Sequence, residues 1–364
     1  MNATSLYVHY PWCVRKCPYC DFDSHPIGKR ALPETDYIDA LIRDLQGYPA
    51  SQGFRTVFFG GGTPSLFSPG SFARLLAEVF VTRGAEITVE ANPGATEHRE
   101  LEGYIEAGIN RLSLGAQSFD DSRLAQIGRI HSANDIASCF HTARTAGFCN
   151  INLDLMYALP GQSPEEALTD LRAATDLKPE HISWYQLTIE PRTEFANRPP
   201  ALPDIDTVIE LETEGRNLLA EHGYRRYEVS AYALAGKECQ HNLNYWSFGD
   251  YVGIGAGAHG KLTHGASVVR TVQPRQPRRY LAEPCSPAEQ PVIAAELPAE
   301  FMMNALRLVD GVPFEHFEAS TGVPWEHLAS QWHEAVQQGL VRDTHIAATA
   351  LGYDHLNALI ARFL

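Results

Sequence analysis

The feature that most constrains this chain is a repeated alternation of strand-like and helix-like segments over its first half. Apolar residues recur at helical spacing around residues 37–45, 72–80, 101–105, 136–146 and 165–177. Six successive β-then-α units predict a parallel sheet with right-handed crossovers. Because six units fall short of eight, we expect an α/β fold built on an open, partial (β/α)6 TIM-like barrel. The strand-like segments are 5–10, 55–59, 86–91, 110–116, 150–157 and 181–187.

The pattern weakens after Pro191, and a proline-rich stretch that contains Pro199, Pro200 and Pro203 predicts a linker. A helix over 208–221 and a strand over 226–233 follow, and residues 264–291 look irregular. Helical spacing returns from Glu300 onward, which predicts a smaller C-terminal, mainly helical, winged-helix-like domain. We therefore expect a barrel over 1–200, an extension over 201–295 and the helical domain over 296–364.

Charge and hydropathy exclude several classes of function. With 29 Lys and Arg against 44 Asp and Glu, the net charge is −15, which disfavours a nucleic-acid partner. No apolar stretch is long enough to span a membrane, which leaves only peripheral membrane contact open. The first residues lack the pattern of a signal peptide, so we expect a cytoplasmic location, where thiols stay reduced.

Three of the seven cysteines, Cys13, Cys17 and Cys20, form a C-x3-C-x2-C cluster. Pro18 disfavours a helix here, so a loop that wraps a metal centre fits better. Arg15 and Lys16 would favour thiolates over thiols. An iron–sulfur cluster normally takes four thiolate ligands, so three would leave one iron open. The alternative is a structural zinc site with His9 or His25 as the fourth ligand.

Polar residues also gather where the predicted strands end. Strand alternation turns Glu90 away from the apolar pair Ile87 and Val89, and it sets Asp154 apart from its apolar neighbours in the same way. If the apolar faces pack on helices, both carboxylates point into the barrel, where a buried carboxylate needs a partner. A polar ligand would provide one. An internal salt bridge with Arg129 is the alternative.

The segment YVHYPWCVRKCPYCDF at 7–22 resembles the cluster loop of radical S-adenosylmethionine (SAM) proteins. More narrowly, the chain from Tyr7 to about His259 resembles the oxygen-independent coproporphyrinogen III oxidase group, with a weaker C-terminal match. The resemblance implies a [4Fe–4S] cluster on the three cysteines, with SAM on the fourth iron and reductive cleavage to a 5′-deoxyadenosyl radical. In such proteins the cofactor supplies the radical chemistry, and the protein supplies binding and orientation.

The same resemblance assigns cofactor-binding roles by motif position. The loop Gly60-Gly61-Gly62-Thr63-Pro64 follows a predicted strand, and glycines let a backbone approach a ligand closely. Tyr7 and Tyr19 are expected to flank the adenine or the cluster. The SAM-binding residues implied in this way are Gly62, Thr63, Glu90, Gln117, Arg129, Asp154 and, more weakly, Gln186.

Two departures from the oxidase pattern point to a sister branch, the HemW-type haem chaperones. Phe22 stands where the oxidase motif has a fourth cysteine, and the chain begins only a few residues before its first strand. The H-N-x-x-Y-W signature of that branch is present at 241–246. The resemblance implies a haem chaperone that binds haem, a [4Fe–4S] cluster and SAM and passes haem to an acceptor protein. The oxidase activity and a zinc-stabilised binding module are the alternatives.

His241 is the first candidate haem ligand, because an imidazole beside large aromatic residues can ligate iron while the rings cover the macrocycle. Its alternative is a structural histidine in a core, and Cys239 and His259 are the next candidate ligands. We expect the motif to lie outside the barrel, and haem and SAM to occupy different sites. Arginines that would pair with the propionates, or simply form a solvated basic loop, are Arg270, Arg275, Arg278 and Arg279.

The segment Gly253–Ala258 also fits a G-x-G-x-x-A pattern. A dinucleotide site would need a following helix and an acidic residue about 20 positions later. The region that follows is basic instead, so we reject a dinucleotide-binding fold here.

Overall fold

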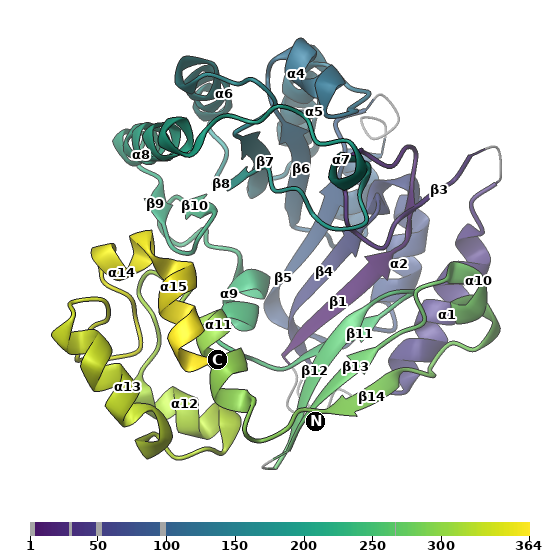
Figure 1. The fold of residues 1–364 in the computed structure, drawn as a ribbon. Coiled ribbons are helices and arrows are strands. Elements are labelled where there is room, and N and C mark those ends of the chain that lie inside the picture. Colours follow the sequence, from purple (N-terminus) through teal and green to yellow (C-terminus); the bar gives the residue numbers. More distant parts are fainter. Residues whose placement is uncertain (1–3, 29–30, 49–52, 95–99, 266) are drawn as a thin grey trace.

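The computed structural model describes residues 4–28, 31–48, 53–94, 100–265 and 267–364. Its centre is a run of six adjacent parallel strands that curve into an open barrel (Figure 1). This confirms the expected partial barrel. The six strands are β1 (Ser5–Tyr10), β4 (Phe54–Gly61), β5 (Val81–Ala91), β6 (Arg111–Gln117), β7 (Ile151–Tyr157) and β8 (His181–Gln186).

Helices cover the outer face of the barrel and bury its main apolar core. Leu41, Phe72 and Phe140 pack from these helices against strand residues such as Val89 and Leu153. The opposite strand face is left for polar side chains inside the barrel. The covering helices are α1 (Glu34–Gln46), α2 (Pro69–Leu76), α3 (Leu101–Glu106), α5 (Ala133–Ala146), α6 (Pro164–Asp176) and α8 (Ile205–Glu221).

The sheet continues beyond the barrel at both edges. β11 (Tyr251–Ile254) lies parallel to β1, and β10 (Ala231–Ala233) lies antiparallel to β8. The strand expected over 226–233 is wrong, because β9 and β10 form a hairpin in which Arg226 bonds the carbonyl of Val229. The expectation that residues 264–291 are irregular is also wrong, because two strands and a helix lie within them. The remaining elements of these edges are β9 (Arg225–Arg226), β12 (His259–His264), β13 (Ser267–Val272), α10 (Pro277–Ala282) and β14 (Ala288–Pro291).

The segment Gly253–Ala258 leads from β11 into β12, and no helix follows it. This confirms the rejection of a dinucleotide site. We expected a helix that reaches Phe80, but α2 ends at Leu76. The Phe80 side chain is exposed, so it does not belong to the buried face of that helix.

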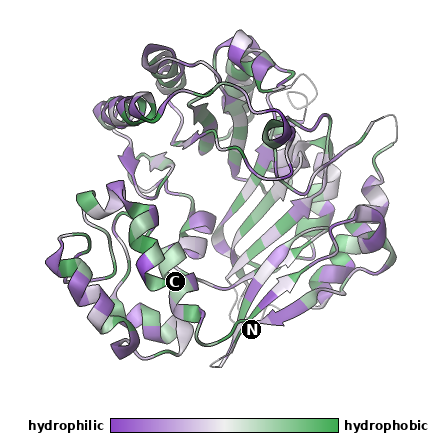
Figure 2. Ribbon diagram, viewed as in Figure 1, coloured by the Kyte–Doolittle hydropathy of each residue, from purple (hydrophilic) through white to green (hydrophobic). Residues whose placement is uncertain are grey.

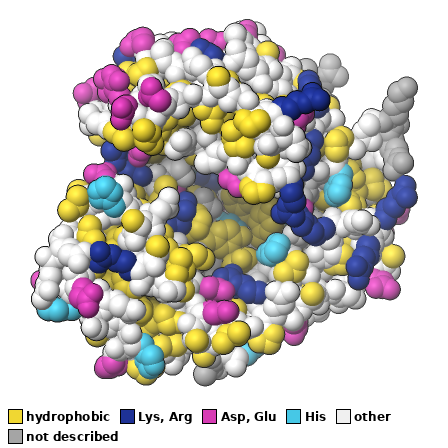
Figure 3. All heavy atoms as spheres, in the orientation of Figure 1, with side chains coloured by type: hydrophobic (Ala, Val, Ile, Leu, Met, Phe, Trp, Pro, Cys, Tyr) yellow, Lys and Arg dark blue, Asp and Glu magenta, His cyan; other side chains and the backbone are white. Residues whose placement is uncertain are grey.

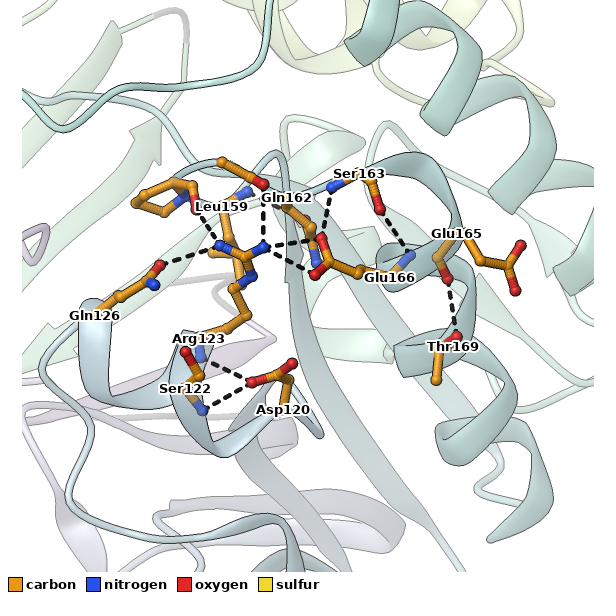
Figure 4. A network of polar contacts seen from close by, with 12 residues as sticks. Asp120, Ser122, Arg123, Gln126, Leu159, Gln162, Ser163, Glu165, Glu166 and Thr169 are labelled. Carbon is orange, nitrogen blue, oxygen red and sulfur yellow. Dashed lines mark hydrogen bonds and ion pairs between the residues drawn. The ribbon is translucent and has the colours of Figure 1, made fainter.

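A short helix that the sequence pattern did not indicate, α4 (Asp121–Gln126), connects β6 to α5. Its Asp120 cap accepts the backbone N–H groups of Ser122 and Arg123. The Arg123 guanidinium then reaches Glu166 in the first turn of α6 at 2.8 Å and the carbonyl of Gly161 at 3.0 Å (Figure 4). One arginine thus ties the starts of two helices to the loop that follows β7.

The C-terminal region has its own apolar cluster, which includes Phe301, Phe317 and Trp332. Figure 2 shows hydrophobic stretches of these helices turned toward one another. Two isolated antiparallel bridges, Val312 to Ile346 and Val341 to Ala348, join the segments that connect the helices. This agrees with a mainly helical C-terminal domain. Its helices are α11 (Leu297–Ala305), α12 (Phe314–Thr321), α13 (Glu326–Gln337), α14 (Ala350–Asp354) and α15 (Leu356–Ile360).

Throughout the described ranges, no helix is both long enough and apolar enough to cross a membrane.

The contact between Gly215 of α8 and the buried Trp184 ring of β8 gives a test of the fold. A Cβ at Gly215 would overlap the ring. Gly215→Ala gains about 1 kcal/mol of helix propensity, yet we expect a net loss of about 1–3 kcal/mol from overpacking. Urea unfolding measures this, with the exposed neighbour Glu214→Ala as a near-neutral control. An equal or raised midpoint for Gly215→Ala would contradict this packing.

Candidate functional site

A cavity of about 350 Å³ lies at the carboxyl ends of the parallel strands. In space-filling view the face in front of these strands is hollowed at its centre (Figure 3). Ligands bind at this end of parallel sheets because the connecting loops meet there. Tyr7 and His241 do not line the cavity. The predicted site residues that do are Cys13, Cys17, Cys20, Tyr19, Gly62, Thr63, Glu90, Gln117, Arg129, Asp154 and Gln186.

The cysteine-bearing segment is a loop, as Pro18 indicated. It starts at β2 (Trp12–Cys13) and ends at β3 (His25–Pro26), which pair as a short parallel ribbon. Inside the loop, the N–H of Cys20 donates to the carbonyl of Cys17 at 3.1 Å. The Phe195 N–H holds the Pro18 carbonyl at 3.0 Å. These contacts bring all three thiols to one wall of the cavity.

Burial dominates the electrostatics of the thiols. It raises the pKa of the Cys13 and Cys20 thiols, and the opposing effect of Lys16 is smaller. The expectation that flanking cations favour thiolates therefore has the right sign for Lys16, but burial outweighs it. The Lys16 ammonium is bound to the carbonyl of Phe22 at 2.8 Å.

The arrangement fits a polynuclear cluster better than a single ion. Among the described residues, no three Cys, His, Asp or Glu side chains converge as ligands of one metal ion would. Both ring nitrogens of His9 are engaged, by the Tyr7 hydroxyl at 3.0 Å and the Asp23 carbonyl at 2.9 Å. His25 belongs to a different groove. The zinc alternative therefore lacks a fourth ligand, whereas three thiols around one open cavity suit a cluster with a free iron.

The glycine loop at the end of β4 is tied to the segment that enters the cysteine loop. The N–H of Gly62 donates to the Tyr10 carbonyl, and that of Thr63 to the Trp12 carbonyl, each at 2.7 Å. A Cβ at Gly62 would overlap the Trp12 carbonyl, so a glycine is needed there. The Gly62 and Thr63 N–H groups are therefore used within the protein, and the loop offers a ligand a close approach rather than these donors.

Glu90 and Asp154 face the cavity, as strand alternation indicated. Glu90 accepts the Gly61 N–H at 3.2 Å, and Asp154 accepts the Ser113 hydroxyl at 2.8 Å. Burial, with the nearby charge of Asp154, raises the pKa of Glu90 to about 8. Neither carboxylate forms an ion pair with any described residue, so the alternative of a salt bridge to Arg129 is wrong.

Arg129 and Gln117 also line the cavity, and Arg129 lies beside the thiol of Cys17. Arg129 donates to the Gly115 carbonyl at 2.9 Å and to the Asn92 side chain, and it lies 3.7 Å from the Cys17 sulfur. Its buried Nε atom has no partner within the protein. The Gln117 side chain accepts the Tyr185 hydroxyl at 2.8 Å. An orphaned buried donor beside two unpaired carboxylates is what a polar ligand would complete.

Asn92, Ser113 and Tyr185 are site residues that sequence reasoning missed. Asn92 directly follows β5 and donates to the Thr63 hydroxyl at 2.9 Å. Ser113 could have been found by the alternation that places Asp154, because the two residues face the same interior. Tyr19 lies against the cavity as expected, and burial raises its pKa. Tyr7 does not flank the cavity.

The H-N-x-x-Y-W motif forms the short helix α9 (Gln240–Trp246) at the amino-terminal ends of the strands, opposite the cavity. His241 is 1% exposed, and its ring nitrogens bond Thr56 and Tyr245, both at 2.8 Å. Burial, with the charge of Arg111, lowers its pKa to about 3. This is the arrangement of a structural histidine. Neither ring nitrogen is free in this arrangement, and the motif packs against β4 of the barrel instead of standing apart from it. The expectation that His241 ligates haem stays a prediction.

The other haem candidates divide by exposure. Cys239 is fully buried, and its thiol donates to Glu86 at 3.5 Å. His259 is exposed at the start of β12. Arg270 pairs with Glu300 at 2.5 Å, and Arg275 contacts Asp23 at 2.8 Å. Arg278 and Arg279 are exposed on α10.

Comparison with known families places both ends of the chain. The model of the Radical SAM superfamily matches residues 7–174, and that of the HemN C-terminal domain matches residues 294–355. The solved coproporphyrinogen III oxidase HemN of Escherichia coli has a TM-score of 0.83 at 21% identity, covering 100% of this chain and 90% of that one. At this identity the likeness shows a shared fold.

Two curated relatives are similar over their whole length. The haem chaperone HemW of Haemophilus influenzae is 46% identical over 374 residues, covering 99% of this chain and 97% of the relative. The haem chaperone HemW of Escherichia coli is 45% identical over 370 residues, covering 99% of this chain and 98% of the relative.

The buried hydrogen bonds of His241 predict a structural effect of its removal. His241→Ala leaves the Tyr245 hydroxyl without its partner and removes one of the two hydrogen bonds of the buried Thr56 hydroxyl, so we expect a loss of about 2 kcal/mol or more in unfolding free energy at pH 7. Because its folded pKa is lowered, the wild type loses this contribution as pH falls from about 6.5 toward about 3. The difference in urea midpoint should therefore shrink in acid. The exposed His222→Ala should change little at any pH, and an unchanged midpoint for His241→Ala would contradict this role.

The raised pKa of Glu90 predicts the opposite pH trend. Between its ordinary pKa of 4.5 and the folded value of about 8, the folded chain holds a proton that the unfolded chain has lost. Its stability therefore falls as pH rises through that window. Glu90→Gln should stabilise the metal-free chain at pH 8 by more than about 1 kcal/mol, and by much less at pH 5. Urea unfolding at both pH values measures this, with the exposed Glu210→Gln as control. A destabilised Glu90→Gln at pH 8 would contradict it.

Proposed function

This chain belongs to the HemW family of haem chaperones, and from that premise we propose that it binds haem and passes it to an acceptor protein. We propose that it does so while holding a [4Fe–4S] cluster and SAM. The observation that carries the proposal is one cavity lined by three thiols, by two carboxylates that form no ion pair with a described residue, and by an arginine with an orphaned Nε donor.

The residues of the cavity divide between the two cofactors. Cys13, Cys17 and Cys20 would hold the cluster, which leaves one iron for SAM. Asp154 complements the cationic groups of SAM. Glu90, which its raised pKa keeps largely protonated at neutral pH, suits the hydroxyls of SAM, and Arg129 offers its free Nε donor. When bound and reduced, the cluster–SAM pair supplies one-electron chemistry. The protein's contribution is to orient SAM against the cluster and to shield both from water.

Phe22 supports the chaperone reading over decarboxylation of coproporphyrinogen. It stands where the oxidase motif continues to a fourth cysteine, and its side chain is 58% exposed beside the cavity. The likeness to the solved oxidase extends over the fold and does not carry its reaction. The acceptor is a protein that takes up haem.

We also propose a reducing, cytoplasmic location. All seven cysteines are free thiols in the structure, and three of them are needed in that state as cluster ligands.

The proposal predicts that haem binding and the cluster can be separated. Cys17→Ala should lose the cluster, because two thiolates cannot hold it, and should still bind haem with the wild-type spectrum. Iron and sulfide analysis after anaerobic reconstitution and a haem titration measure the two properties. The exposed Cys149→Ala is the matched control and should keep both.

The same preparation tests the reaction. Incubated with coproporphyrinogen III, SAM and a reductant, the wild type should form little or no protoporphyrinogen, whereas haem-loaded protein should transfer haem to an apoprotein. Robust SAM-dependent decarboxylation would favour the oxidase reading. A wild-type protein that binds no haem would refute the chaperone function.

A further inference from the structure

The short β2–β3 ribbon has two faces, and only one of them belongs to the cluster cavity. Cys13 and Ser24 line the cavity, whereas their neighbours Trp12 and His25 line a second hollow on the other side. Side chains alternate along β2, so Trp12 and Cys13 point to opposite sides, whereas in β3 both His25 and Pro26 line the second hollow. The ribbon thus forms a wall one backbone thick between two sites.

The second hollow, here called the ribbon groove, has a volume of about 870 Å³, within the usual range for small-ligand sites. It lies between the ribbon, the start of α1 and helix α10. Most of its lining is apolar, as for flat hydrophobic ligands. The apolar residues used in the argument are Trp12, Ile27, Leu32, Pro33, Pro277 and Leu281.

The ribbon groove has few polar residues, and they are neutral or basic in type. They are His25, Gln276 and Arg278, and no acidic residue is among the described residues that line it. This is notable in a chain with a net charge of −15. Lys and Arg side chains lie along the flank of the molecule over α10 and β3 (Figure 3). The groove therefore suits an apolar ligand that carries anionic groups.

His25 has a ring that is free to bind. Its Nε2 atom has only a long contact of 3.4 Å with the Arg275 carbonyl, and the residue is half-buried. By contrast, both ring nitrogens of His241 are held at 2.8 Å in the core. An imidazole at the edge of an apolar groove is a common axial ligand of haem iron.

The walls of the ribbon groove are held in place by buried contacts. Tyr280 of α10 donates to Asp44 of α1 at 2.7 Å, and Gln273 donates to the same carboxylate at 2.8 Å. Trp12 packs edge-on against Tyr37, with ring centroids 4.7 Å apart. The groove thus exists before a ligand binds, which lowers the entropic cost of binding.

We propose that haem binds in the ribbon groove, with His25 as an axial ligand of the iron and Arg278 paired with a propionate. This inference rests on the proposed haem-chaperone function and specifies where that function is carried out. It places haem on one face of the β2–β3 ribbon and the cluster on the other.

Haem titration of the full-length, reconstituted protein tests the ligand. His25→Ala should weaken haem affinity by about tenfold or more and shift the Soret band, since iron loses a ligand. Added imidazole should restore the wild-type spectrum in this variant. Full iron content and unchanged SAM binding in His25→Ala would show that the fold is intact. The exposed His259→Ala serves as the competing variant and should keep the wild-type spectrum.

Two neighbouring arginines of α10 test the anionic contact. Arg278 lines the groove and Arg279 does not, although both are exposed. Arg278→Glu should therefore weaken haem binding several-fold more than Arg279→Glu, at equal change of net charge.

These experiments distinguish a failure of the proposed haem site in the ribbon groove from a failure of the proposed chaperone function. A wild type that binds no haem would overturn both proposals. A wild type that binds haem, with His25→Ala and Arg278→Glu unchanged, would overturn the groove and leave the chaperone function standing. A spectrum that changes in His259→Ala but not in His25→Ala would also overturn it.

Discussion

The site depends on one close backbone contact, between the glycine loop after β4 and the segment that enters the cysteine loop. The N–H groups of Gly62 and Thr63 bind the carbonyls of Tyr10 and Trp12, each at 2.7 Å. A side chain at position 62 would overlap the Trp12 carbonyl. Because this contact fixes the backbone on both sides of Trp12, it decides that Cys13 turns toward the cavity and Trp12 away from it.

Polar groups inside the barrel are distributed unequally between its two ends. At the amino-terminal end, His241 is fully hydrogen-bonded, and Glu86 accepts N–H groups from the start of α9. At the carboxyl end, Glu90 carries a raised pKa and Arg129 an unpartnered Nε. Leaving buried polar groups unpaired costs stability unless a ligand pairs them. The amino-terminal end has orphaned atoms too, such as Arg111 Nε and Trp246 Nε1, but these residues do not line the cavity. The carboxyl end combines its orphaned donor with an open cavity, so it is the end suited to binding.

The sequence predicted the parallel strands of the barrel and missed the short antiparallel strands at its edges. Strand alternation placed Glu90 and Asp154 correctly, because a parallel strand shows its inward face in its own residues. The β9–β10 hairpin and strands β12 to β14 were not predicted, since each is only two to six residues long and lacks a regular alternation of buried and exposed residues. The six residues of the H-N-x-x-Y-W motif did not reveal that α9 would cover the amino-terminal end of the sheet, where both ring nitrogens of His241 are hydrogen-bonded.

The β2–β3 ribbon links the two proposed sites by geometry alone. Each of its strands is two residues long, so Trp12 and Cys13 share one peptide unit, and Ser24 adjoins His25. Trp12 is held without either ligand, because its ring packs against Tyr37 and its carbonyl accepts the Thr63 N–H. Loss of the cluster therefore leaves the wall of the ribbon groove in place. The two proposed sites share this wall, and each can bind its ligand independently.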